Sequence, residues 1–342
     1  MDIFEPREMT EALLERKRPK SFLRDTFFSQ SENHNTAAVD IHILEGKRRL
    51  APYVAPNAPG VLVQKDGFQQ ETFIPPLVKP KDVTTAEDVL RSVRPGESVY
   101  TDGRGNSAAE RAAWILGEDM ARLDDSITRR EEQQAAEALF TGALVIKGHG
   151  EDRTIDFGLN AAQKPVLAGT SKWSDPASNP LADLDKWKRE HSQRSGVTAT
   201  DVVMGADALA AFLDHEKVKT AFDNRQITTG DINFEEVGEN VTLVGRIARF
   251  GLNLWSYDEW YYDDATSQEK AMVPENKVLI TSRRAMFKRH YGVIPENIPV
   301  VGERWVKTWE IEDPASRLLM VQSRPLMVPH QKNALVIGTV VD

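Results

Sequence analysis

The chain has 342 residues, of which 40% are apolar and 28% are charged, enough to bury one large hydrophobic core or two modest ones. Its 52 acidic residues outnumber its 43 basic ones, and the net charge of −9 argues against a dedicated nucleic-acid binder. The absence of cysteine excludes disulfides, thiolate nucleophiles and Cys-ligated zinc. No run approaches the roughly 18 apolar residues of a membrane span, and residues 1–22 hold no apolar signal core, so we expect a globular chain that remains where it is made.

The N-terminal segment combines a charged helix with an aromatic run. Residues 8–18 place apolar side chains among charges, which predicts a weak amphipathic helix that Pro19 ends. Residues 22–28 then carry three phenylalanines. This run fits a segment that fills a pocket of its own core, and it also fits an arm that packs on another subunit. The residues alone favour the core.

The next segment is open and rich in Pro and Gly. Residues 38–44 alternate apolar and polar side chains, which predicts a half-buried strand with His42 facing solvent. Two strand-like runs, 61–63 and 69–74, flank a turn at Asp66-Gly67 and predict a hairpin. Because an isolated hairpin is marginal in water, it needs a surface to lie on, and that surface could belong to another copy. The segment therefore points to assembly rather than catalysis.

A long helix is predicted from Ser107 to Leu139. Ser107 and Glu110 fit a capping box, apolar residues recur at helical spacing, and Gly142 ends the pattern. Such a helix is about 50 Å long. Its apolar stripe is narrow, so we expect a strut lying across a sheet rather than a buried core helix.

The rest of the chain predicts an α+β fold. Strands are expected at residues 144–147, 154–158, 201–205, 241–245, 252–255, 277–281 and 334–338. Helices are expected at residues 187–191, 206–212 and 215–222. Residues 305–311 and 317–322 flank a turn and predict a long hairpin late in the chain.

Catalytic and metal-binding motifs are weak. Gly103-Arg104-Gly105 precedes a helix but lacks the Lys-Ser/Thr ending of a phosphate-binding loop. The seven histidines (34, 42, 149, 191, 215, 290 and 330) show no metal-binding spacing, and no serine lies in a Gly-x-Ser-x-Gly elbow. We therefore predict no catalytic, cofactor-binding or metal-binding residues and no cofactor.

One acidic and aromatic cluster supports an alternative. Asp258, Glu259, Asp263 and Asp264 lie among Trp255, Tyr257, Trp260, Tyr261 and Tyr262. Paired carboxylates beside aromatic rings occur in sugar-binding clefts and hydrolases, so a soluble α+β hydrolase is the rival interpretation. The default for such a cluster is a hairpin tip with a solvated acidic edge.

The one compact basic stretch comprises Arg283, Arg284 and residues 288–290. It could contact packaged DNA, or it could form a salt-bridge face between subunits. The acidic total favours the salt bridges.

Several segments, in this order along the chain, resemble the lambda-type major capsid proteins of tailed phages. These segments are residues 22–24 (Phe-Leu-Arg), 53–56 (Tyr-Val-Ala-Pro), 73–81, 173–174, 202–205, 273–278, 291–292 and 320–327. The resemblance covers nearly the whole chain from Phe22, and its strength lies in the shared order rather than in any single motif.

The resemblance implies the Hong Kong 97-type capsid fold. It divides the chain into an N-terminal arm (1–44), an extended loop (45–100), a peripheral domain with the spine helix (101–157), an axial domain (158–299), a peripheral-domain hairpin (300–325) and a C-terminal strand returning to the axial domain (326–342).

The implied function is that of a structural major capsid protein and not of an enzyme. Copies would form hexamers and pentamers of an icosahedral head around double-stranded DNA, located in the virion after assembly in the host cytoplasm. Implied partners are a scaffolding protein, a portal protein and a decoration protein seated on residues 39–44 and 61–73. Some relatives cross-link through a loop lysine, but for Lys65 we predict no isopeptide bond.

Overall fold

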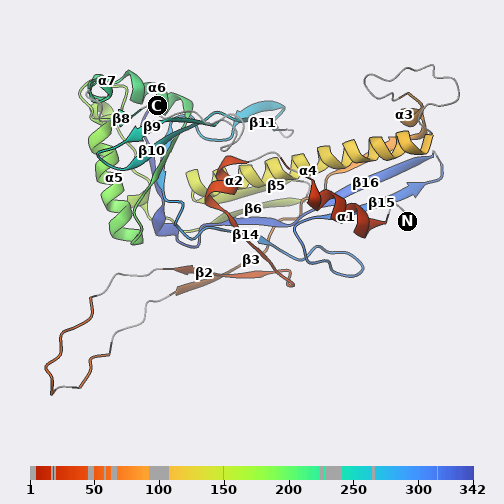
Figure 1. The fold of residues 1–342 in the computed structure, drawn as a ribbon, viewed down its shortest axis with the longest axis horizontal. Helices are drawn as coiled ribbons and strands as arrows, with labels where there is room; N and C mark the ends of the chain where they lie inside the picture. Colours follow the sequence, from red (N-terminus) through yellow and green to blue (C-terminus); the bar gives the residue numbers. More distant parts are fainter. Residues whose placement is uncertain are drawn as a thin grey trace.

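The computed structural model describes residues 5–16, 18, 21–44, 50–57, 59–62, 68–91, 108–148, 150–223, 227–228, 241–263, 266–313 and 315–342. The molecule is elongated: one long helix lies along half of it, a mixed sheet with short helices forms the other end, and a two-stranded ribbon leaves the body (Figure 1). Gly103-Arg104-Gly105, which the sequence did not favour as a phosphate-binding loop, and the capping-box Ser107 lie outside the described residues.

Helix α4 (Ala108–Phe140) confirms the predicted long helix. Its first half buries only a stripe, but in its second half Ala135, Leu139 and Phe140 have no exposed surface. The expectation of a strut with one narrow buried face is therefore wrong for the second half, because α2 (Phe22–Phe27), β5 (Ala143–Gly148) and β17 (Pro325–Val328) pack around it.

Gly142 ends α4 for a conformational reason. Its φ is +72°, and a Cβ there would lie 2.3 Å from Leu159 Cδ1. Only glycine accepts this left-handed turn without strain. The chain then enters the hairpin of β5 and β6 (Glu151–Asp156), which confirms the two short strands predicted there.

The first half of α4 packs on a three-stranded sheet ordered β15-β16-β4. Strands β15 (Trp305–Ile311) and β16 (Ser316–Gln322) form the predicted late hairpin, and β4 (Lys81–Thr85) pairs with β16. Helix α1 (Pro6–Glu15) completes a hydrophobic cluster with α4 and this hairpin. Short helix α3 (Ala86–Arg91) follows β4.

The opposite end holds a six-stranded sheet ordered β18-β13-β7-β10-β9-β8. Its strands are β7 (Asp201–Met204), β8 (Ile227–Thr228), β9 (Val241–Ile247), β10 (Leu252–Tyr257), β13 (Lys277–Thr281) and β18 (Val336–Thr339). Helices α5 (Pro180–Ser195), α6 (Ala206–Asp214) and α7 (Glu216–Asp223) lie at this end (Figure 1). The sheet pairs strands that lie far apart in the sequence, and their side chains form one hydrophobic cluster, as in an α+β fold.

A third sheet, ordered β1-β14-β17, lies between these ends. Strand β1 (Gln30–Asn33) runs parallel to β14 (Lys288–Tyr291), which pairs antiparallel with β17. The aromatic run packs here in its own chain: Phe22 and Phe28 are buried, and Phe28 contacts Phe287. The interpretation that it fills a core pocket is confirmed.

The predicted hairpin of residues 61–63 with 69–74 is wrong. Strand β3 (Phe68–Phe73) pairs with β2 (Val39–Leu44), and residues 61 and 62 belong to no strand. The Asp66-Gly67 turn, which lies outside the described residues, predicted that residues 69–74 pair with the run just before them. Instead, β3 pairs with β2, which lies about thirty residues earlier in the chain. The predicted strand over residues 38–44 is confirmed, and the His42 side chain lies outside the described residues.

Two glycines give a matched test of the fold. A Cβ on Gly205, at the start of α6, would lie 2.3 Å from the Pro274 carbonyl oxygen, whereas nothing lies within 4 Å of a Cβ on Gly117 in α4. We expect Gly205→Ala to destabilise the unassembled chain by about 1–3 kcal/mol, because backbone must move. Gly117→Ala should stabilise it by about 0.5–1 kcal/mol. Urea unfolding monitored by circular dichroism checks both, and equal effects would contradict the contact at Gly205.

Candidate functional surfaces

The β2–β3 ribbon continues into a segment with no buried side chain among its described residues. We call its described residues, 50–57 and 59–62, the extension; all of them are exposed. Leu50 and Leu62 are 95% and 99% exposed, and Tyr53 is fully exposed. The extension projects away from the body (Figure 1). Large apolar side chains held this far from any core mark a surface that another molecule covers.

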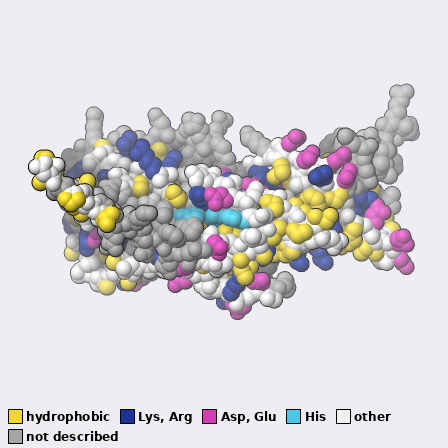
Figure 2. Space-filling view, turned by 90° about the horizontal axis from the view of Figure 1, so that it is seen from below, with side chains coloured by type: hydrophobic (Ala, Val, Ile, Leu, Met, Phe, Trp, Pro, Cys, Tyr) yellow, Lys and Arg dark blue, Asp and Glu magenta, His cyan; other side chains and the backbone are white. Residues whose placement is uncertain are grey.

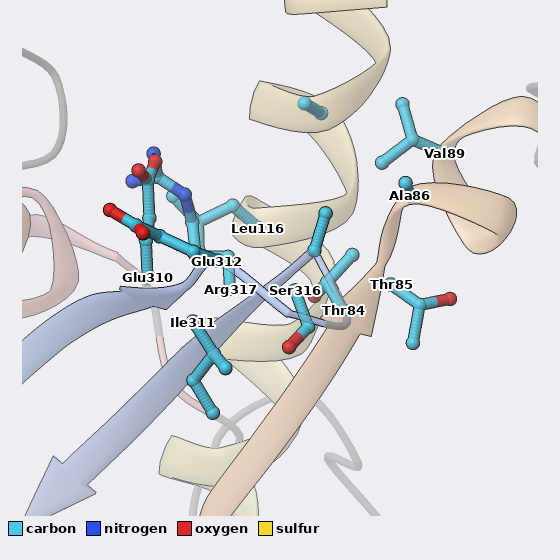
Figure 3. Close-up of a pocket in the computed structure, with 12 residues that line it drawn as sticks. Thr84, Thr85, Ala86, Val89, Leu116, Glu310, Ile311, Glu312, Ser316 and Arg317 are labelled. Carbon is cyan, nitrogen blue, oxygen red and sulfur yellow. The ribbon is translucent and has the colours of Figure 1, made fainter.

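A pocket of about 360 Å³ opens between the first half of α4, α3 and the tip of the β15–β16 hairpin. Its labelled lining residues are Thr84, Thr85, Ala86, Val89, Leu116, Glu310, Ile311, Glu312, Ser316 and Arg317 (Figure 3). Arg317 donates to Glu310, so the one guanidinium of this lining is already paired.

The acidic and aromatic cluster is split between core and surface. Trp255 and Tyr257 are buried in β10, whereas Trp260 is about half exposed on β11 (Trp260–Asp263), which forms a hairpin with β12 (Gln268–Ala271). Asp258 accepts from Trp260 Nε1 at 2.8 Å, and Asp263 accepts from Thr266 and Lys270. This is the expected hairpin with an acidic edge; Asp264 lies outside the described residues. Each described carboxylate is held by its own neighbours, which does not favour a hydrolase.

A buried ionic network joins three parts of the chain across α4. Arg304 is 2% exposed and donates to Asp124 Oδ1 at 2.8 Å and to Glu131 Oε1 at 2.6 Å. Arg24 donates to the other oxygen of Glu131 at 3.0 Å, and Arg18 donates to Asp124 Oδ2 at 2.7 Å. Both carboxylates of α4 are thus shared between guanidiniums of the N-terminal segment and of the residue preceding β15.

The network sets the charge of its members. Burial alone would raise the pKa of Glu131, but the guanidiniums of Arg304 and Arg24 hold that pKa below its usual value. Burial would likewise lower the pKa of Arg304, yet Glu131 and Asp124 raise it. Glu131 and Arg304 therefore hold each other in the charged form, and removal of either takes a charged hydrogen bond from a buried partner.

Glu132, the next residue on α4, lies in a different environment. It accepts the backbone N–H groups of Leu23 and Arg24 at 2.7 and 2.8 Å, and the Tyr257 hydroxyl at 2.8 Å. It is buried and lacks a cationic partner among these contacts. Burial raises the pKa of Glu132 to about 7, against the lowering effect of the three hydrogen bonds.

This pKa predicts a pH dependence with a definite sign. Because the folded pKa lies above the ordinary value of 4.5, the contribution of Glu132 to stability is complete below about pH 4.5 and is lost as pH rises towards 7. The loss is on the order of 3 kcal/mol. Glu132→Gln should remove this pH dependence of the unfolding free energy. The variant should also be less stable at every pH, because the glutamine NH₂ group would face a backbone N–H donor.

Urea unfolding gives the unfolding free energy of the wild type and of Glu132→Gln from pH 4.5 to 8. The difference between these two free energies is then followed against pH. Buried histidines such as His191, whose pKa burial lowers to about 4, act in the opposite direction and cancel in the difference. A pH-independent difference would show that Glu132 does not titrate in this range.

The basic stretch makes its described ion pairs within the chain. Arg283 pairs with Asp201 at 3.2 Å and lies over the Trp255 ring, while Lys288 pairs with Glu32. Arg289 lies 3.7 Å from Asp25. These partners were not foreseen, since they lie far away in sequence, and they engage side chains that would otherwise be available to DNA or to another subunit.

Three of the histidines come together, although their spacing gave no signal. His34 Nε2 lies 2.8 Å from His290 Nδ1, and His290 Nε2 lies 2.8 Å from His330 Nε2. His191 and His215 form hydrogen bonds elsewhere, to Ala334 and to Ser178.

No helix of the described residues is long and apolar enough to cross a membrane.

The fold and the exposed extension do not by themselves identify the protein family. The sequence model of the family described as Phage major capsid protein E matches residues 5–340. The chain belongs to this family. The resemblance to lambda-type capsid proteins is thus confirmed, and the protein is a structural major capsid protein of a phage. Membership implies a structural rather than an enzymatic role and a place in the virion capsid.

Solved structures of phage and prophage proteins share the fold. A protein assigned as a prophage capsid protein in E. coli CFT073 is 19% identical, with a TM-score of 0.74 over 98% of this chain and 99% of that chain. A phage-related protein from Bordetella bronchiseptica RB50 is 12% identical, with a TM-score of 0.56 over 96% and 95%. The cyanophage A-1(L) capsid protein is 10% identical, with a TM-score of 0.51 over 96% and 94%. No curated protein sequence matches the chain. The capsid protein therefore has the Hong Kong 97-type fold that the sequence predicted.

Proposed function

We propose that this capsid protein assembles into hexamers and pentamers of an icosahedral phage head that encloses double-stranded DNA. The observation that carries the proposal is the extension, in which Leu50, Tyr53 and Leu62 are almost fully exposed. A monomer gains nothing by holding these side chains in water, whereas a neighbouring subunit that covers them gains about 1.5–3 kcal/mol for each. In the described part of the chain the β2–β3 ribbon that bears the extension is a two-stranded sheet, and a neighbour can cover its outer edges.

We propose that the chain is divided into domains at the boundaries that the resemblance to the family implies. Residues 1–44 are the N-terminal arm, 45–100 the extended loop, 101–157 and 300–325 the peripheral domain, and 158–299 with 326–342 the axial domain. Support comes from the sheets: β18 returns to the six-stranded sheet, and the β15–β16 hairpin packs on the first half of α4. The buried network of Arg304 holds the arm and the peripheral domain together.

The proposed partners are a scaffolding protein during assembly in the host cytoplasm, a portal protein and a decoration protein. The β2–β3 ribbon and the extension are the proposed seat of the decoration protein. DNA contact is proposed to be non-specific, because the chain carries a net charge of −9. We propose no covalent cross-link through Lys65, which lies outside the described residues.

Expression alone and together with the neighbouring phage proteins, followed by negative-stain electron microscopy, tests the proposal. Closed shells or tubes are expected in at least one of these conditions. Particles no larger than dimers under every condition would contradict it. A denaturing gel of the shells should show single chains, and a ladder of covalent multimers would contradict the absence of cross-links.

A further inference from the structure

Three side chains with metal-binding atoms lie on one face of the sheet where β1 meets β14. The two strands run parallel, with Glu32 opposite His290. Alternate residues of a strand share a face, so His34, two residues beyond Glu32, lies on the same side. The backbone N–H of His34 donates to the Tyr291 carbonyl at 2.8 Å, which continues the ladder and fixes this position.

The donor atoms converge. His34 Nε2 lies 2.8 Å from His290 Nδ1, and Glu32 Oε2 lies 3.7 Å from the same nitrogen. One donor atom from each of the three residues lies within 4.8 Å of the others. Two nitrogens bound to tetrahedral zinc at about 2.0–2.1 Å are roughly 3.3 Å apart. A rotation of the partly exposed His34 ring lengthens the distance between the His34 and His290 nitrogens by the roughly half ångström that a bound ion requires.

The surroundings already hold two of these groups in orientations that suit a cation. His290 Nε2 lies 2.8 Å from His330 Nε2, so the His290 tautomer that donates this hydrogen bond leaves the Nδ1 lone pair directed at His34. A histidine that binds a metal usually donates its other ring N–H to a fixed acceptor in this way. Lys288 Nζ donates to Glu32 Oε1, which leaves Oε2 as the oxygen on the His290 side.

We propose that Glu32 Oε2, His34 Nε2 and His290 Nδ1 bind one divalent transition-metal ion, with zinc as the best match and water at the fourth position. Two imidazole nitrogens and one carboxylate are a zinc donor set. The His290 ring is buried, whereas the Glu32 side chain is 43% exposed, so the site is anchored on one side and open on the other. Seen from below, the molecule shows histidine side chains at its surface with acidic and basic side chains nearby (Figure 2).

The proposed ion has a structural consequence. Glu32 and His34 belong to the segment that leads into the β2–β3 ribbon, and His290 belongs to the body of the molecule. An ion held by both would fasten the base of the ribbon to the body. The sequence predicted no histidine-rich metal site because His290 lies more than 250 residues from Glu32 and His34, so no spacing motif joins the three.

The test uses the untagged full-length chain, since a histidine tag would bind the same ions. After treatment with EDTA, the chain is titrated with Co²⁺, whose visible absorption reports tetrahedral coordination, and with Zn²⁺ by calorimetry. We expect one ion per chain. Glu32→Gln and His34→Gln, both at partly exposed positions, should weaken binding by at least about tenfold. The control His215→Gln, in the Ser178 contact, should leave binding unchanged.

X-ray absorption of the zinc-loaded wild-type chain gives a readout independent of the variants. Two imidazole nitrogens with oxygen donors are expected in the first coordination sphere. The proposal is overturned if no ion binds at one per chain, if the Glu32 and His34 variants bind as tightly as wild type, or if the absorption shows another donor set. A hydrogen-bonded histidine cluster without an ion would then be the correct description.

Discussion

Replacement of three apolar side chains of the extension, Leu50→Ser, Tyr53→Ser and Leu62→Ser together, should abolish shells while leaving the subunit folded. All three are almost fully exposed in the isolated chain, so their loss costs the monomer nothing in buried area. In an assembled lattice their burial contributes about 1.5–3 kcal/mol each, so a subunit contact would lose roughly 5 kcal/mol or more. Negative-stain microscopy measures the shells, and circular dichroism with urea unfolding measures the fold.

The matched control changes exposed apolar residues away from the extension. Ile298→Ser and Val166→Ser alter side chains that are 80% and 72% exposed in the part of the chain assigned to the axial domain. They should reduce assembly less than the triple variant does. Shells at the wild-type level from the triple variant would show that the extension does not carry the subunit contact. Loss of fold in that variant would show that its side chains pack within their own subunit.

Arg304→Met should destabilise the subunit by about 3–5 kcal/mol, the largest effect expected of a single substitution here. The guanidinium is 2% exposed and bonds both Asp124 and Glu131, which are themselves fully buried. Asp124 keeps Arg18 and Glu131 keeps Arg24, but each buried carboxylate loses a charged hydrogen bond that water cannot replace, and this cost exceeds the gain from methionine packing. Urea unfolding of the unassembled chain at pH 7 measures the loss.

Arg189→Met is the control, because Arg189 makes an ion pair with Asp185 on the surface of α5 and its side chain is 73% exposed. Its cost should stay below about 1 kcal/mol. Equal costs for Arg304→Met and Arg189→Met would show that the network contributes no more than a surface pair.

Local patterns predicted the elements that depend on local physics. The 3.6-residue spacing of apolar side chains located α4, and Gly142 located its end because only glycine takes the positive φ found there. Alternation located β2, and a run of buried apolar residues located β7. The shared order of short segments then pointed to the capsid family, which the match over residues 5–340 bears out.

Pairing between distant segments could not be read in this way. The turn signal at Asp66-Gly67 suggested a nearby partner for β3, but β3 pairs with β2. The buried second half of α4 also escaped prediction, because its alanines look alike whether they face solvent or a neighbouring element. What encloses them is α2 and β17, which come from opposite ends of the chain.

The sequence by itself determined the types of the elements, the α+β class and the capsid family, since propensity, periodicity and segment order are properties of neighbouring residues. Only the tertiary structure decided which charges and rings meet. Arg304 reaches Asp124 across 180 positions, and His34 reaches His290 across 256. Such contacts depend on strand register and helix packing, which are set by the burial of whole faces and leave no mark at any fixed spacing in the chain.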